Sequence, residues 1–219
     1  MLTTVTFVTI GQTPRTDLVP ELAARLPAGT VIREVGALDG LDEAAVAALA
    51  PGPDDARLVT RMADGSQVVV AKAWVHARLE EVLSGLSRDP SALTVLLCTG
   101  EFPGLRGPGI FLDAQHLVDH GVAALCAGMH RIGLMLPLAE QTEEFHWKPG
   151  PRQELKVTYS SPYVGERFEA AAAELADCDA VVMNCMGYTE DQRRRVASAS
   201  GRPALLARRF VASAVAQLL

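Results

Sequence analysis

Short apolar runs rich in Val, Ile and Leu alternate along the chain with segments whose apolar positions follow helical spacing. Such runs are typical of strands, and such spacing is typical of helices packed on one face. We expect strands at residues 4–10, 30–35, 93–98, 131–136, 156–160, 179–185 and 203–206. We expect helices at residues 17–26, 42–49, 72–86, 113–127, 139–147, 164–175, 189–198 and 209–218. Strands that alternate with helices predict an α/β fold with mainly parallel sheets covered on both faces.

Two segments depart from this alternation. Residues 58–62 and 67–71 are separated by Ala63-Asp64-Gly65-Ser66, a turn signal that predicts a β-hairpin. Residues 99–109 are rich in Gly and Pro and predict a loop.

The strand and helix pattern restarts near Arg131, which indicates two similar α/β lobes, at residues 1–128 and 129–219. A chain of 219 residues is long enough for one large domain or two small lobes. The last helix either stays in the second lobe or packs back on the first. Because aromatic residues make up only 5% of the chain, the core must consist mainly of Ala, Val and Leu.

The formal charge of −6 argues against a general nucleic-acid-binding protein, which needs a basic surface. It does not argue against a small anionic partner, because one placed Arg can bind a carboxylate. The N-terminal residues lack the basic start of a signal peptide, and no apolar run reaches the roughly 18–20 residues that cross a bilayer. We therefore expect a cytoplasmic protein with no membrane partner.

Two cysteines lie where chemistry is expected. In open α/β sheets, ligands bind beyond the carboxyl ends of the strands. Cys98 and Cys185 each end an expected strand, and a glycine lies two residues after each of them. If the lobes are related by a pseudo-twofold axis, these cysteines would face each other across a cleft. Inverting a carbon next to a carboxylate needs a base on one face and an acid on the other, and two thiols can supply both.

The alternative is that cysteines are buried for packing alone, as they often are. Cys126 lies within an expected helix and Cys178 precedes its strand, so we interpret both as packing or surface thiols. The four cysteines form no CxxC pair and no spacing typical of zinc, which favours free thiols. We expect no metal and no cofactor.

Polar residues accompany these strand ends. Gln12 and Arg15 follow the first strand, Thr99 follows Cys98, and Asn184 precedes Cys185. The Arg15 guanidinium either holds a substrate carboxylate or is an ordinary exposed group or one paired with Asp17, and spacing alone leaves these alternatives open.

Other motifs favour no further site. The glycine-rich stretches fit neither a dinucleotide fingerprint nor a P-loop. His116 and His120 are spaced to share a metal, but a solvated helix face explains them more simply. Residues 193–195, three consecutive arginines, are most simply an exposed patch.

Several of these segments resemble the AroM family. The matching segments are Thr9-Ile10-Gly11-Gln12-Thr13-Pro14-Arg15, Glu34-Val35-Gly36-Ala37-Leu38-Asp39-Gly40-Leu41, Ile132-Gly133-Leu134-Met135-Leu136-Pro137 and Met183-Asn184-Cys185-Met186-Gly187-Tyr188. They extend over nearly the whole chain. The resemblance implies a relationship to the Asp/Glu/hydantoin racemase superfamily, whose members have two α/β lobes, often a cysteine pair, and no cofactor.

That superfamily usually has Cys-Asn-Thr at the first cysteine and Gly-Cys-Thr followed by His or Glu at the second. The corresponding segments here are Cys98-Thr99-Gly100 and Asn184-Cys185-Met186-Gly187. We expect the residues that flank the two cysteines to lie beside the substrate: Thr99, Gly100, Asn184, Met186 and Gly187. Most flanking donors differ, so an amino-acid substrate is not carried over. Relatives of this fold commonly dimerise, which makes a homodimer an expectation.

Three functions follow from these residues. The leading hypothesis is a cofactor-independent racemase, epimerase or isomerase acting on a small carboxylate, with Cys98 and Cys185 as acid and base. The second is an isomerase or decarboxylase that uses one cysteine. The third is a non-catalytic protein that binds a metabolite. The substrate is not specified by the sequence.

Overall fold

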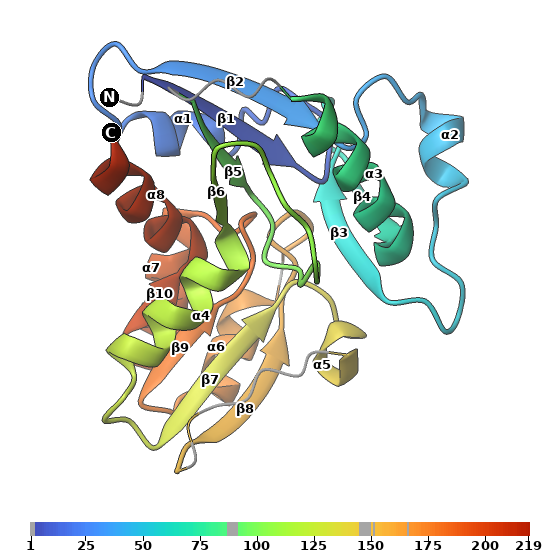
Figure 1. Ribbon diagram of the computed structural model, residues 1–219. Helices are drawn as coiled ribbons and strands as arrows, with labels where there is room; N and C mark the ends of the chain where they lie inside the picture. The colour runs from blue at the N-terminus through green and yellow to red at the C-terminus, as the bar shows by residue number, and fades with distance from the viewer. Residues whose placement is uncertain (1–2, 87–91, 145–149, 151, 166) are drawn as a thin grey trace. The chain divides into compact units, whose positions relative to one another are not determined.

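The structure is a computed structural model that describes residues 3–86, 92–144, 150, 152–165 and 167–219. The chain divides into two compact units, Met1–Gln115 with Ala212–Leu219, and His116–Val211. Each unit contains a parallel four-stranded sheet flanked by helices, which confirms the expected α/β class with two similar lobes (Figure 1). The domain limits of 1–128 and 129–219 stay a prediction.

The sheet of the first unit has the strand order β2-β1-β5-β6, with all neighbours parallel. Its strands are β1 (Thr4–Thr9), β2 (Val31–Gly36), β5 (Ala92–Leu96) and β6 (Ile110–Asp113). Every residue of β1 is buried, as a central strand covered on both faces requires. The helices are α1 (Val19–Ala23), α2 (Glu43–Ala47) and α3 (Lys72–Gly85).

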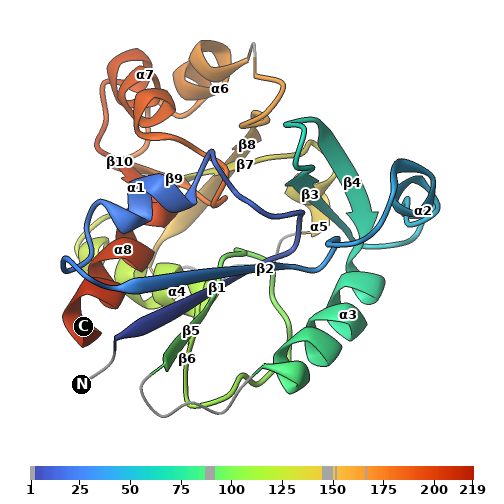
Figure 2. The ribbon, with the colours of Figure 1, turned by 90° about the horizontal axis from the view of Figure 1, so that it is seen from above.

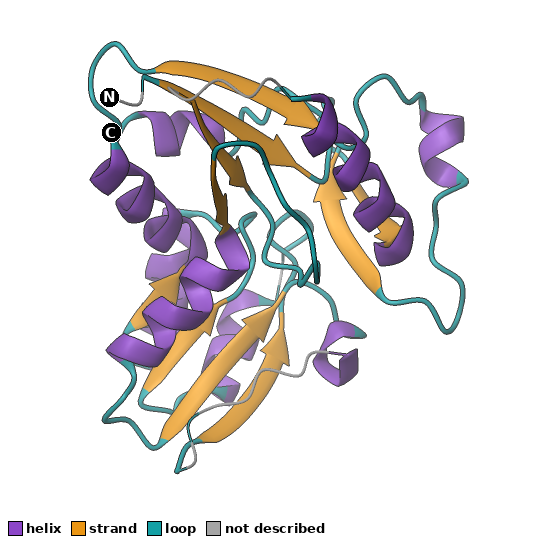
Figure 3. Ribbon diagram, viewed as in Figure 1, coloured by secondary structure: helices purple, strands orange, loops and turns teal. Residues whose placement is uncertain are grey.

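The predicted hairpin is confirmed. Strand β3 (Arg57–Arg61) pairs antiparallel with β4 (Gln67–Ala71) as a separate two-stranded sheet (Figure 3). The turn between them contains Gly65 at φ +94°, a conformation that favours glycine. The hairpin therefore interrupts the parallel sheet without joining it.

Strand β6 was not expected, because residues 110–112 were assigned to no element and Asp113 was expected to begin a helix. The strand has only four residues, all of them partly or fully exposed. It pairs with β5 along one edge only, and its apolar run, residues 110–112, is only three residues long. Helix α4 (Ala114–Leu125) follows it directly.

The sheet of the second unit has the order β10-β9-β7-β8, again with all neighbours parallel. Its strands are β7 (Arg131–Leu136), β8 (Glu154–Tyr159), β9 (Ala180–Met183) and β10 (Ala204–Leu206). The helices that follow α4 are α5 (Gln141–Glu144), α6 (Phe168–Glu174), α7 (Glu190–Ser200) and α8 (Ala207–Leu218). Residues 145–147 of the helix expected at 139–147 lie outside the described residues.

The two sheets share one plan. If the hairpin is set aside, each sheet arranges its strands in the order second, first, third, fourth (Figure 2). Strand β5 therefore corresponds to β9, and β6 corresponds to β10. This correspondence allows residues of one unit to be compared with residues of the other by register alone.

A cluster of apolar side chains covers one face of each sheet. In the first unit, Val75, Leu79 and Leu83 of α3 belong to a cluster that includes Leu96 and Cys98. In the second unit, side chains of α6 and α7 belong to a cluster that includes Met183 and Cys185. Both cysteines thus lie at the edge of a core, directly beyond a strand.

Candidate functional site

Cys98 and Cys185 occupy corresponding positions. Cys98 lies two residues beyond β5, and Cys185 lies two residues beyond β9. Their exposed fractions are 7% and 8%. The sequence placed both at strand ends, and the structure places both in the loop immediately after the strand.

Each of the two sulfurs accepts a hydrogen bond from the backbone N–H of the glycine two residues later. The N–H of Gly100 donates to the Cys98 sulfur over 3.3 Å, and the N–H of Gly187 donates to the Cys185 sulfur over 3.4 Å. A donor aimed at sulfur favours the thiolate over the thiol, whereas burial favours the neutral thiol. Each cysteine therefore has a backbone hydrogen bond that can stabilise a negative charge on its sulfur.

Gly187 is required by close packing. A Cβ at this position would lie 2.6 Å from the Tyr163 hydroxyl and 2.8 Å from Pro162 Cγ. Such distances force a neighbour to move, so only glycine lets the loop after Cys185 keep this path. At Gly100 the nearest atom to an added Cβ would be Leu58 Cδ2, at 3.0 Å.

The remaining predicted residues of these loops have different exposures. Thr99 and Gly100 are partly exposed, whereas Asn184 and Met186 are buried. The backbone N–H of Asn184 donates to the Met135 carbonyl over 3.0 Å, which extends the pairing between β7 and β9. The structure thus brings Asn184, Met186 and Gly187 together around Cys185, and Thr99 and Gly100 around Cys98. Substrate contacts for these five residues stay a prediction.

A buried cation also touches the Cys185 loop. Arg208, at the start of α8, is 1% exposed. It donates to the Met186 carbonyl over 3.1 Å and to the Gly187 carbonyl over 3.0 Å. Sequence reasoning missed this residue, because an Arg at the start of a helix is usually exposed.

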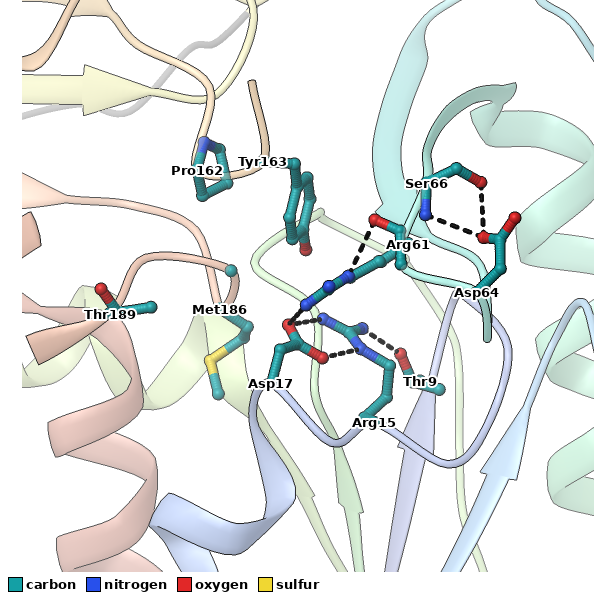
Figure 4. A network of polar contacts seen from close by, with 12 residues as sticks. Thr9, Arg15, Asp17, Arg61, Asp64, Ser66, Pro162, Tyr163, Met186 and Thr189 are labelled. Atoms are coloured by element: carbon teal, nitrogen blue, oxygen red, sulfur yellow. Dashed lines mark hydrogen bonds and ion pairs between the residues drawn. The ribbon is translucent and has the colours of Figure 1, made fainter. Parts of the chain in front are cut away.

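Arg15 is buried and paired. Its guanidinium donates two hydrogen bonds to the Asp17 carboxylate, both of 2.9 Å, and a third of 2.8 Å to the Thr9 hydroxyl (Figure 4). Its side chain is only 4% exposed. Of the alternatives for Arg15, the pairing with Asp17 is present, but the residue is not an ordinary exposed arginine. A substrate-binding role stays a prediction.

Arg61 is a second cation at this position that the sequence did not indicate. It lies 3.9 Å from Asp17 and is about one third exposed, at 32%. Burial alone would raise the pKa of Asp17, but hydrogen bonds from Arg15 and the charges of Arg15 and Arg61 outweigh it and lower that pKa. Two guanidiniums therefore surround one carboxylate, and these three side chains carry a net positive charge.

The Gln12 side chain is bonded to backbone at both ends. Its amide nitrogen donates to the carbonyls of Leu38 and Leu41, over 3.3 and 2.9 Å. Its amide oxygen accepts from the Ala63 N–H over 3.0 Å. These bonds join the loops after β1 and β2 to the hairpin turn, so Gln12 has a structural use. Its expected substrate contact stays a prediction.

Cys126 and Cys178 have a different character. Burial is the main cause that raises the pKa of each, with a further contribution from Asp179 for Cys126 and from Asp177 for Cys178. Both therefore favour the neutral thiol, as the packing interpretation requires.

The remaining motifs form no further site. Within the described ranges, no group of three or more His, Cys, Asp or Glu residues could hold a metal. The His120 ring lies 2.8 Å from the His116 carbonyl oxygen. The three consecutive arginines all form ion pairs, Arg193 with Glu190, Arg194 with Asp191 and Arg195 with Glu169. No helix in the described part of the chain is both long enough and apolar enough to span a membrane.

Comparison with known proteins gives a family and a fold. The family model described as AroM protein matches residues 5–219. No curated protein matches the chain. Among solved structures, maleate isomerase Iso from Pseudomonas putida S16 is similar with a TM-score of 0.55, at 13% identity, over 100% of this chain and 93% of that one.

Two further structures are similar to the same degree. Nocardia farcinica maleate cis-trans isomerase gives a TM-score of 0.54 at 14% identity, over 99% of this chain and 92% of that one. Allantoin racemase from Pseudomonas fluorescens gives a TM-score of 0.54 at 11% identity, over 98% of this chain and 90% of that one. At these identities the likeness concerns the fold alone.

Proposed function

The chain belongs to the AroM family, and on that premise we propose that it is a cofactor-independent racemase, epimerase or isomerase of a small carboxylate. Cys98 and Cys185 are the acid and base in this proposal. The observation that carries it is the repetition of one arrangement: a buried cysteine two residues beyond the third strand, with its sulfur facing a glycine N–H, in each sheet. Packing alone does not require this arrangement twice.

The chemistry follows from two equivalent thiols. Removing a proton from the carbon next to a carboxylate needs a thiolate, and returning a proton to the opposite face needs a thiol. The hydrogen bond from Gly100 or Gly187 stabilises whichever sulfur is negative, and the low exposure of both sulfurs strengthens that interaction. The proton moves from carbon to one sulfur and from the other sulfur to carbon, so the reaction requires no cofactor.

Positively charged side chains are the expected binding partners of the substrate carboxylate. Arg15 and Arg61 place two guanidiniums around Asp17, and an arginine fork binds a carboxylate well. We propose that Arg61, which is the more exposed of the two, shares the substrate carboxylate with Arg15. Thr99 and the loop residues Asn184, Met186 and Gly187 complete the expected contacts.

The experiment is exchange of the α-hydrogen in heavy water. The purified protein is incubated with a panel of small carboxylates that carry one hydrogen on the carbon next to the carboxylate, and exchange is followed by proton NMR. Cys98→Ser and Cys185→Ser should each abolish inversion of that carbon. Cys126→Ser is the matched control, because it removes a buried thiol that does not lie at this end of a strand, and it should leave the rate unchanged.

The other outcomes identify the competing functions. A covalent adduct on one cysteine, together with a large effect of only that substitution, would favour a single-cysteine isomerase or decarboxylase. Tight binding of a carboxylate without any exchange would favour a metabolite-binding protein. Inversion that persists in either single variant, or exchange that persists when both cysteines are replaced together, would contradict the proposal.

A further inference from the structure

Arg208 is the largest of the fully buried side chains in the described residues. A buried charge is costly unless its donors are hydrogen bonded, so the partners of this guanidinium indicate its use. It donates to the carbonyls of Met186 and Gly187, over 3.1 and 3.0 Å. Both carbonyls belong to the loop that follows Cys185.

One of these carbonyls connects Arg208 to the cysteine. The Met186 carbonyl and the Gly187 N–H are the two ends of a single peptide group. Arg208 donates to the carbonyl end, and the N–H end donates to the Cys185 sulfur over 3.4 Å. A charged donor on a carbonyl polarises the peptide and makes its N–H a stronger donor. The peptide thus transmits the charge of Arg208 towards the sulfur.

The first unit has a different side chain at the position that corresponds to Arg208 by strand register. Strand register pairs Leu96 with Asp113, and it pairs Met183 with Leu206. Counting two residues onward from each, Cys98 corresponds to Cys185, and Gln115 corresponds to Arg208. Gln115 is also buried, at 2% exposed. At this position the two units therefore differ by one full positive charge.

Among the described residues, the other titratable groups on the elements packed around Cys185 are a phenol and carboxylates in ion pairs. The pKa of Tyr188 is raised by burial, and further by Cys185 and Tyr163, so its phenol stays neutral. The carboxylates of the helices packed in the Cys185 cluster are held in ion pairs. These pairs are Glu169 with Arg195, Glu174 with Arg167, Glu190 with Arg193 and Arg209, and Asp191 with Arg194.

We propose that Arg208 is a positioning residue that makes Cys185 the resting thiolate, acting through the Met186–Gly187 peptide, while Cys98 rests as the thiol. The catalytic meaning of this inference rests on the proposed function. Cys185 would take the α-proton and Cys98 would give one back, so the two groups start in opposite protonation states. After one turnover Cys185 holds the proton and Cys98 is deprotonated, and exchange with water restores the resting state.

The test is the pH dependence of alkylation at each cysteine. The protein is treated with iodoacetamide over a range of pH, and the modified cysteines are quantified by mass spectrometry. This titration needs no substrate, so it succeeds or fails independently of racemase activity. Cys185 should show its midpoint at lower pH than Cys98. Arg208→Gln, which makes the second unit like the first, should raise the Cys185 midpoint by about one pH unit and slow its alkylation at neutral pH about tenfold.

Two further variants separate charge from structure. Arg209→Gln removes the same charge from the neighbouring, exposed residue and should leave the midpoint unchanged. Arg208→Lys keeps the charge but loses the guanidinium that reaches both carbonyls, and it should give a Cys185 midpoint between those of the unaltered protein and Arg208→Gln. A Cys98 midpoint at or below that of Cys185 in the unaltered protein would overturn the proposal, and this comparison needs no variant to fold. If the Cys185 alkylation rate in Arg208→Gln falls equally at every pH, the proposal is also overturned. That result would show that only the access of iodoacetamide to the sulfur has changed.

Discussion

Cys98 and Cys185 each lie two residues beyond the third strand of a parallel sheet, and each sulfur accepts a hydrogen bond from the glycine two residues further on. The two sheets have the same strand order, so this equivalence is built into the fold. The difference between the two positions lies in the next strand exit, where one unit has a neutral Gln115 and the other a charged Arg208.

Replacing Gly187 by Ala should destabilise the second unit. The added Cβ would lie 2.6 Å from the Tyr163 hydroxyl and 2.7 Å from its ring carbon Cζ. Overpacking of this kind costs about 1–3 kcal/mol of unfolding free energy, which urea denaturation can measure. Gly85→Ala is the control. Nothing lies within 4 Å of its added Cβ, and Ala has a higher helix propensity than Gly at this last residue of α3. Equal stability of the two variants would contradict the packing described for Gly187.

Removing the carboxylate beside Arg15 should also destabilise the protein. In Asp17→Asn the buried guanidinium loses its charged partner and one of its two hydrogen bonds of 2.9 Å, because an amide nitrogen cannot accept, and this costs about 3 kcal/mol. Asp191→Asn breaks an exposed pair whose two side chains are 63% and 72% exposed, and should change stability by less than about 1 kcal/mol.

The pH dependence of that difference has a definite sign. Because the pKa of Asp17 is lowered from its ordinary value of 3.8, its contribution is fully present above that value. The contribution is lost as pH falls through the folded-state pKa. Unfolding free energies measured for the unaltered protein and Asp17→Asn should therefore differ by a constant amount near neutral pH and converge in acid. A difference that grows in acid would contradict the lowered pKa.

Tyr188 tests the structure that supports the Cys185 loop. Its hydroxyl donates to the Ser160 carbonyl over 2.7 Å, so Tyr188→Phe should cost about 1 kcal/mol of unfolding free energy. Tyr159→Phe is the control, because the ring of Tyr159 stacks on Arg167, at 4.3 Å from its centroid, and that contact does not use the hydroxyl.

Alkaline pH gives a second measurement on Tyr188. Burial raises the pKa of Tyr188 well above 10. Its contribution to stability is present below the ordinary pKa of a phenol and is lost as pH rises through the folded-state value. Phenolate absorbance from Tyr188 should appear only as the protein unfolds, and an earlier appearance would contradict its burial.

The two remaining thiols should be slow to react. Burial is the main cause that raises the pKa of Cys126 and Cys178. At pH 7, iodoacetamide should therefore modify both at least about tenfold more slowly than Cys185. Mass spectrometry of the folded protein measures this order, and treatment in denaturant should make all four rates similar. Faster reaction at Cys126 or Cys178 would contradict their assignment to packing.

The sequence predicted most of the fold because its strands carry continuous apolar runs. Residues 131–136 form β7 as predicted, and the turn at residues 63–66 fixed the hairpin. Strand β6 was missed because its residues 110–113 are partly exposed and follow a Gly/Pro-rich loop. A short edge strand of this kind forms because it pairs with a neighbouring strand, and its own residues give only a weak strand pattern.

The candidate site was predicted in part for the same reason. Cys98 and Cys185 follow apolar runs, so their strand-end positions could be inferred. Arg208 could not, because its burial depends on carbonyls of a loop about twenty residues earlier. Arg61 belongs to the hairpin and meets Asp17 only in the folded unit. For Arg15, spacing could not decide between ion pairing and ligand binding, because both use the same guanidinium.

The central claim is that Cys98 and Cys185 serve opposite faces of one carbon. The most direct measurement is α-hydrogen exchange in heavy water, begun from each pure enantiomer of a substrate, in Cys98→Ser and in Cys185→Ser. Each variant should lose inversion but, at a pH where the remaining cysteine is a thiolate, still exchange the enantiomer whose hydrogen faces that cysteine, so the two variants should exchange opposite enantiomers. If both variants exchange the same enantiomer, or if inversion persists in either, the two-cysteine account is wrong.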